Sequence, residues 1–85
     1  MNEVELARMQ AVKNAHEADL LRKANVVGVG IGRRQRGGQE TGEPAIVVSV
    51  TEKVSASDLA PRDVIPRELE GVPVDVQAVG VLRAL

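Results

Sequence analysis

The sequence predicts a small α+β domain, in which a long N-terminal amphipathic helix packs on a three-stranded, largely antiparallel sheet. Three observations predict this fold class. Residues 2–24 contain no glycine or proline and repeat apolar residues every three or four positions. Three later segments alternate apolar residues with small or polar ones, which is the period of a strand. The length of 85 residues leaves room for one domain, which we expect to span residues 1–85.

The predicted helix runs from about residue 2 to residue 24. Its apolar residues fall in two rows, and together these rows form a wide stripe that we expect to cover the sheet. The first row is Val4, Ala7, Ala11, Ala15, Ala18 and Leu21, and the second is Leu6, Met9, Val12 and Leu20.

The predicted strands cover about residues 26–34, 45–53 and 72–79. A polar segment over 36–44 separates the first two and is predicted to be a turn too long for a tight hairpin. The segment from Ser55 to Pro61 predicts one or two helical turns before the last strand. Alternation places one set of side chains toward the helix: Val27, Val29, Ile31, Ile46, Val48, Val50, Val74 and Val76.

The opposite face of the predicted sheet is unusually bare. Gly28, Gly30 and Gly32 alternate along the first strand, and glycine weakens a strand, so we expect something to approach this backbone closely. The face is small, flat and half apolar, which suits a protein partner. The predicted interface residues are Val26, Gly28, Gly30, Val47, Ser49 and Val79.

Cofactor, metal and catalytic sites are not expected. The run from Gly28 to Arg33 departs from the dinucleotide-binding loop, because Arg33 stands where that loop needs its third glycine. His16 is the only histidine, and its helical neighbours Val12 and Leu20 are not metal ligands, so we expect a surface or packing role for it. Ser49, Ser55 and Ser57 lack the sequence context of a nucleophile. We therefore predict a protein that is not an enzyme.

Among the charged residues, only the basic cluster at the end of the first predicted strand allows two interpretations. Asp58, Asp63, Glu68, Glu70 and Asp75 are predicted to be solvated surface groups. The basic cluster Arg33, Arg34 and Arg36 could contact a phosphate or an acidic partner. Alternatively, the cluster keeps a strand end soluble, which we favour.

Composition excludes several other partners. The chain has no aromatic residue to stack on bases, and its net charge of −1 gives no field that would attract phosphates, so nucleic acid is not expected. Without cysteine, disulfides and thiolate metal sites are impossible. No signal peptide and no apolar run of membrane-spanning length is present. We expect a soluble, cytoplasmic protein.

The order of glycine, proline and valine residues over about 16–85 resembles a known family. The residues are Leu20-Leu-Arg-Lys-Ala-Asn-Val-Val-Gly-Val-Gly-Ile-Gly32, Gly42-Glu-Pro-Ala-Ile-Val-Val-Ser-Val50, Asp63-Val-Ile-Pro66, Gly71-Val-Pro-Val-Asp-Val76 and Val79-Gly80. They resemble the N-terminal region of bacterial and plant proteins that continue into a trypsin-like serine protease domain. The resemblance implies an accessory module without catalytic residues.

Two functions from different classes follow. The first is a non-catalytic interaction module that docks a protein partner, such as a protease domain, through its glycine-lined face or a strand edge. The second is a structural protein that assembles with copies of itself into a homo-oligomer, with the long helix contributing contacts.

Overall fold

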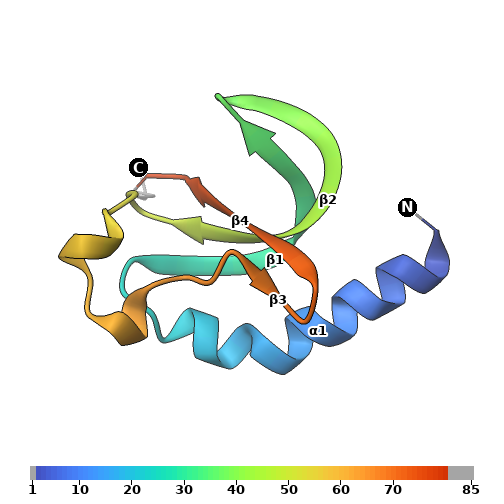
Figure 1. The fold of residues 1–85 in the computed structure, drawn as a ribbon, viewed down its shortest axis with the longest axis horizontal. Coiled ribbons are helices and arrows are strands. Elements are labelled where there is room, and N and C mark those ends of the chain that lie inside the picture. Colours follow the sequence, from blue (N-terminus) through green and yellow to red (C-terminus); the bar gives the residue numbers. More distant parts are fainter. Residues whose placement is uncertain (1, 81–85) are drawn as a thin grey trace, which may run out of the picture.

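The computed structural model describes residues 2–80 and shows one helix on one face of a mixed four-stranded sheet (Figure 1). The helix is α1 (Glu3–Leu21), and the strands are β1 (Val26–Arg36), β2 (Gln39–Val50), β3 (Glu68–Leu69) and β4 (Val72–Ala78). Two single 3₁₀ turns, η1 (Ala56–Asp58) and η2 (Pro61–Asp63), connect β2 to β3. The predicted α+β class and N-terminal helix are therefore confirmed.

The sheet differs from the predicted one in strand number and direction. Its order is β1-β2-β4-β3, and β2 runs parallel to β4 while the outer pairs are antiparallel. The expectation of three largely antiparallel strands is wrong because the connection over residues 51–71 is a crossover. A connection of that length returns the chain to the end of the sheet at which β2 began, so that β4 can run parallel to it.

Two turns of the sheet are formed by only two residues each. Arg36 pairs with Gln39, so the first hairpin turns through Gly37 and Gly38 alone, at φ of 58° and 80°. The expected long polar turn over 36–44 is wrong, because two residues with positive φ match the twist of the flanking strands. Glu70 and Gly71 join β3 to β4 in the same way, at φ of 50° and 81°.

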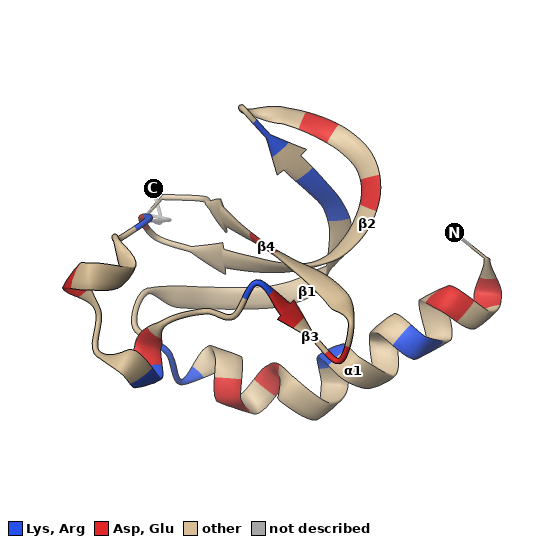
Figure 2. Cartoon of the chain, viewed as in Figure 1, with Lys and Arg blue, Asp and Glu red and all other residues tan. Residues whose placement is uncertain are grey.

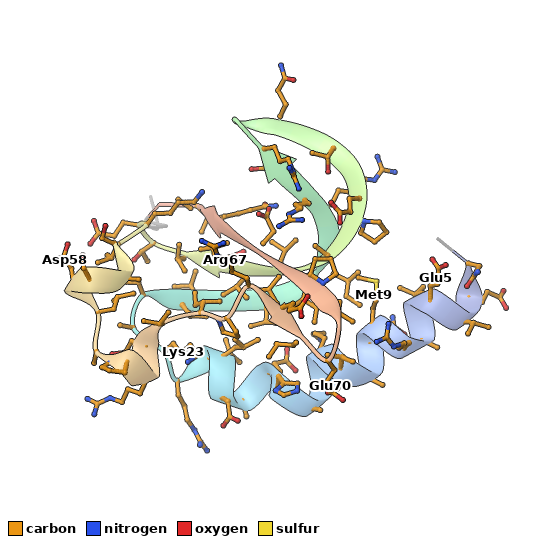
Figure 3. All side chains as sticks on the ribbon, viewed as in Figure 1. Glu5, Met9, Lys23, Asp58, Arg67 and Glu70 are labelled. Atoms are coloured by element: carbon orange, nitrogen blue, oxygen red, sulfur yellow. The ribbon has the colours of Figure 1, made fainter. Side chains whose placement is uncertain are left out.

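The core lies between α1 and the sheet. Only the second apolar row of the helix enters it: Met9, Val12 and Leu20 are buried, while Val4 of the first row is 79% exposed. Figure 3 shows Met9 on the side of α1 that faces the sheet. The sheet contributes Ile46, Val48, Val50, Val72 and Val74. The sheet therefore covers only half of the expected wide stripe.

A β-bulge shifts the start of β1. Val26 pairs with Val50 and Gly28 pairs with Ser49, which leaves Val27 as an extra residue. Val26 consequently packs against the core and Val27 is 55% exposed, the reverse of the predicted arrangement. Beyond the bulge the prediction holds, because Val29 and Ile31 pack against the core, both partly buried.

Candidate interaction surface

The predicted bare face exists on the side of the sheet opposite α1. We call it the glycine-lined face; it consists of Gly28, Gly30, Gly32, Val47, Ser49 and Gln77. It forms the floor of a hollow of about 450 Å³ whose polar margin includes Arg33, Gln35 and Glu40. Four of the six predicted interface residues, Gly28, Gly30, Val47 and Ser49, are brought together here.

The space above these glycines differs along the strand. A Cβ atom built on Gly30 meets nothing within 4 Å, and one on Gly28 would lie 3.8 Å from Cβ of Ser49, an ordinary contact. At Gly32 the new atom would lie 3.0 Å from Cγ2 of Val47, which is too close without a shift. Within the described chain, the predicted close approach is therefore found at Gly32 and not at Gly30.

The other two predicted interface residues lie elsewhere. Val26 faces the core because of the bulge at Val27, so its assignment to the interface is wrong. Val79 follows the end of β4, where its N–H donates to the carbonyl of Val50 at 2.8 Å, and its side chain is 48% exposed. It does not line the hollow.

The curled hairpin of β1 and β2 is fixed above this face by β4 (Figure 1). The backbone N–H of Gln35 donates to Oδ2 of Asp75 at 2.9 Å. Nε2 of Gln77 donates to the same oxygen at 3.0 Å and to the carbonyl of Arg33 at 3.1 Å. Asp75 is thus a structural acceptor rather than the solvated group that the sequence predicts.

Replacing Asp75 with Ala should loosen the hairpin that borders the hollow. The change removes the acceptor of two hydrogen bonds, and we expect a loss of about 1–2 kcal/mol in the free energy of unfolding. Faster hydrogen exchange of the Gln35 amide would report the local loosening. Asp58→Ala is the matched control, because Asp58 is exposed and has no ion pair or side-chain hydrogen bond within residues 2–80. Equal effects of the two substitutions would contradict this role.

The basic cluster at the end of β1 is largely balanced by acidic residues of β2 (Figure 2). Nη1 of Arg33 lies 3.3 Å from Oε1 of Glu40, and Nη1 of Arg34 lies 3.4 Å from Oε2 of Glu43. Arg36 is exposed next to the Gly37–Gly38 turn. Because two of the arginines are paired with glutamates, these contacts favour the second interpretation, in which the charges keep the strand end soluble. They do not favour an anion-binding site.

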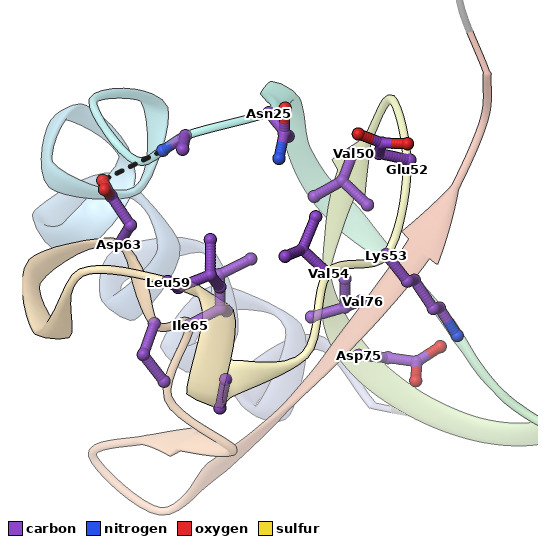
Figure 4. A pocket seen from close by; sticks show the side chains of 13 residues that line it. Asn25, Val50, Glu52, Lys53, Val54, Leu59, Asp63, Ile65, Asp75 and Val76 are labelled. Atoms are coloured by element: carbon purple, nitrogen blue, oxygen red, sulfur yellow. Dashed lines mark hydrogen bonds between the residues drawn. The ribbon is translucent and has the colours of Figure 1, made fainter.

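A second hollow lies below the connection between β2 and β3 (Figure 4). It measures about 360 Å³ and has mostly aliphatic walls, among them Val50, Val54, Leu59, Ile65 and Val76. Asn25, with φ of 68°, stands at its margin, and Oδ1 of Asp63 accepts the N–H of Ala24 at 3.1 Å. Asn25 is the one sign of this turn in the sequence, since asparagine tolerates the left-handed region after a helix. Val50 and Val76 belong to the strand alternation that the sequence shows, whereas Val54, Leu59 and Ile65 lie in the irregular connection and were not predicted as part of a hollow.

His16 forms a structural contact with the β3–β4 turn. Its Nε2 lies 3.0 Å from Oε2 of Glu70, and Nη2 of Arg8 donates to the carbonyl of Glu70 at 2.6 Å. Figure 3 shows Glu70 beside α1. Ser49 lies on the other side of the sheet, so His16 and Ser49 do not form a nucleophilic pair. The packing role predicted for His16 agrees with these contacts.

Within residues 2–80, His, Cys, Asp and Glu side chains form no group of three that could hold a metal ion. The same residues include no helix that is both long and apolar enough to cross a membrane. The hollow over the glycine-lined face is therefore the candidate site that both the sequence and the structure indicate.

The fold and this surface define a small helix-on-sheet domain with an open, glycine-lined sheet face. The family described as the NARROW LEAF 1 N-terminal domain matches residues 4–81, nearly the whole chain, and the chain belongs to this family. No curated protein matches the sequence.

The family match corrects the resemblance drawn from the sequence. The chain belongs to the NARROW LEAF 1 N-terminal domain family and is not an accessory module of trypsin-like serine proteases. The positions that suggested proteases are explained by the fold itself: Gly42 and Gly71 adopt φ of 81°, and the alternating valines supply the core. Glycine and valine at these positions reflect the backbone conformation and the core packing of this fold. They carry no information about a neighbouring protease.

Proposed function

We propose that this domain is a non-catalytic protein-interaction module that binds a polypeptide partner at the glycine-lined face. The observation that supports the proposal is the open space above Gly30. Apart from Gly30 and its two chain neighbours, no residue of the described chain has a heavy atom within 4 Å of an added Cβ. Three alternating glycines weaken a strand, and this cost is offset if a partner packs on the bare backbone. The floor of the hollow combines bare glycine backbone with the side chains of Val47, Ser49 and Gln77, which fits an inserted side chain of a protein.

The sheet edge beside this face offers a second element of recognition. Among the strands of residues 2–80, β1 is at one end of the sheet and pairs with β2 alone. An extended segment of the partner could add to this edge between the bulge at Val27 and Arg33, and its alternate side chains would then reach the hollow. The exposed margin of the hollow contains the basic Arg33, the polar Gln35 and the acidic Glu40, which could form the polar rim of such an interface. The cytoplasm is the compartment in which we place this interaction.

Gly30→Arg is the substitution that tests this function. The added side chain fills the hollow, and because the site is open we expect it to change the free energy of unfolding by no more than about 0.5 kcal/mol. The wild-type chain and the variant would each be used to capture partners from extracts of the native cells, with quantitative mass spectrometry as the readout. We expect at least one protein to be captured about tenfold less by Gly30→Arg, corresponding to about 1.4 kcal/mol.

Ser57→Arg is the control, since it adds the same charge at an exposed position of η1. It should capture the same proteins as the wild type. The proposal fails if a folded Gly30→Arg variant captures everything that Ser57→Arg captures. A large loss of stability in Gly30→Val would also contradict it, because valine favours strands and should be neutral or stabilising at an open position.

A further inference from the structure

The outer side of α1 carries a second apolar surface that nothing in the described chain covers. Val4 is 79% exposed and Leu21 is 46% exposed, and these are two of the large apolar side chains that residues 2–80 leave at the surface. Between them lie the exposed residues Ala7, Ala11, Ala15 and Ala18. The opposite side of the helix already packs on the sheet through Met9, Val12 and Leu20. The helix therefore has two apolar faces, and within residues 2–80 only one of them packs against other residues.

The spacing of the exposed face is that of a coiled-coil seam. Its residues are separated by alternate steps of three and four: Val4, Ala7, Ala11, Asn14, Ala18 and Leu21. These are consecutive a and d positions of a heptad repeat, and such a narrow stripe is typical of a helix that packs on one other helix. The alanines allow a close approach of the two backbones.

The charges beside this seam point to a second copy of the same helix as its partner. The flanking g positions hold Glu3 and Glu17, and the e positions five residues later hold Arg8 and Arg22. In two parallel helices, each g position lies next to the e position five residues further along the partner. Glu3 then meets the partner's Arg8, and Glu17 meets the partner's Arg22, both with opposite charge.

An antiparallel pair would lose this complementarity. In that arrangement g positions neighbour g positions and e positions neighbour e positions, so glutamates would face glutamates and arginines would face arginines. The exposed Asn14 supports the parallel arrangement as well, because it would face the partner's Asn14 in the middle of the seam. Asn14 is at a d position, and Nζ of Lys13 donates to its Oδ1 at 3.4 Å, so its amide N–H groups are available to the partner's Asn14. A polar pair inside an apolar seam favours the register that pairs it, at some cost in stability.

We propose that two copies of this chain associate in parallel through the outer faces of their α1 helices. The existing contacts of the charged residues are compatible with this pairing. Oε1 of Glu17 lies 3.3 Å from Nζ of Lys13 on the same helix, and the other carboxylate oxygen of Glu17 can accept from the partner's Arg22. Arg22 lies 3.6 Å from Asp19 with both side chains largely exposed, and Arg8 keeps further N–H groups besides the one donated to Glu70. The helix of 19 residues is about 28 Å long, so the interface is small and the dimer should dissociate on dilution.

Charge reversal tests the pairing directly. Sedimentation equilibrium of the whole chain over a wide range of concentrations should show a monomer–dimer equilibrium for the wild type. Glu17→Arg places like charges beside the partner's Arg22, and Arg22→Glu places them beside the partner's Glu17, so each variant alone should dimerise about tenfold more weakly. An equimolar mixture of the two variants should regain the wild-type association, because every pair is again opposite in charge.

Disulfide trapping tests the orientation and needs no further change, since the chain has no cysteine of its own. Under mild oxidation, Ala18→Cys should form covalent dimers, because parallel packing places position 18 next to position 18 of the partner. Ser57→Cys, exposed in η1, should stay monomeric under the same conditions. In an antiparallel dimer, cross-links would form instead in a mixture of Ala7→Cys and Ala18→Cys chains.

Three results would overturn the proposal: a wild type that is monomeric at every concentration, a mixture of the charge variants that fails to associate, or cross-linking confined to the Ala7→Cys and Ala18→Cys mixture. The first would leave the outer face of α1 to a different protein. The proposed function is tested separately, because the glycine-lined face lies on the other side of the sheet and Gly30→Arg should leave dimerisation unchanged.

Discussion

Leu20→Ala is expected to lower the free energy of unfolding by about 2–5 kcal/mol. Leu20 is 2% exposed and packs from α1 into the core of the sheet, so truncation removes apolar contacts and leaves a cavity. A domain of 85 residues has a total stability of only about 4–13 kcal/mol. The variant should therefore unfold at a markedly lower urea concentration. Far-ultraviolet circular dichroism would follow the unfolding, because the chain has no aromatic residue for fluorescence.

Leu21→Ala is the matched control for this experiment. The same atoms are removed one residue later, from a side chain that is 46% exposed, and we expect a loss below about 1 kcal/mol. Both variants would be measured at high dilution, where the proposed dimer through Leu21 is dissociated. Losses of equal size would mean that α1 is rotated about its axis relative to the structure.

The two leucines illustrate how much of the helix could be predicted from the sequence. Periodicity correctly indicated a helix over most of residues 2–24 and both of its apolar rows. It could not say that the sheet would cover only one row, because that depends on the width of the sheet and on the side chains that it presents. The row with Met9 and Leu20 is covered because its larger side chains bury more apolar area than alanines do.

The strands were predicted less well where a single residue controls the geometry. Alternation placed Val48 and Ile46 on the core face correctly, since no irregularity separates them. The bulge at Val27 has no clear sequence sign, and it exchanged the faces of Val26 and Val27. Strand β3 has only two residues, too few for any period to be visible.

The sequence predicted the floor of the candidate surface but not the contacts that hold the hairpin beside it. Alternating glycines identify Gly28 and Gly30 from the sequence alone, because their spacing needs no knowledge of the tertiary fold. Asp75 and Gln77 hold the hairpin over that floor from 40 or more residues away along the chain. Contacts of this kind arise from the parallel pairing of β2 with β4, which the sequence did not indicate.

Val48→Ala should cost about 2–4 kcal/mol in the free energy of unfolding, because the side chain is 0% exposed on the inner strand β2. The cost includes both the lost burial of the removed methyl groups and the cavity that they leave. The informative comparison is with the two adjacent valines at the bulge. Val26→Ala should cost about 1–2 kcal/mol because Val26 is partly buried against the core, while Val27→Ala should cost less than about 0.5 kcal/mol. Urea unfolding of the three variants gives this order directly. If Val27→Ala proved more destabilising than Val26→Ala, the bulge would be absent and the first strand would keep strict alternation, because a shift of one residue exchanges the two faces of a strand.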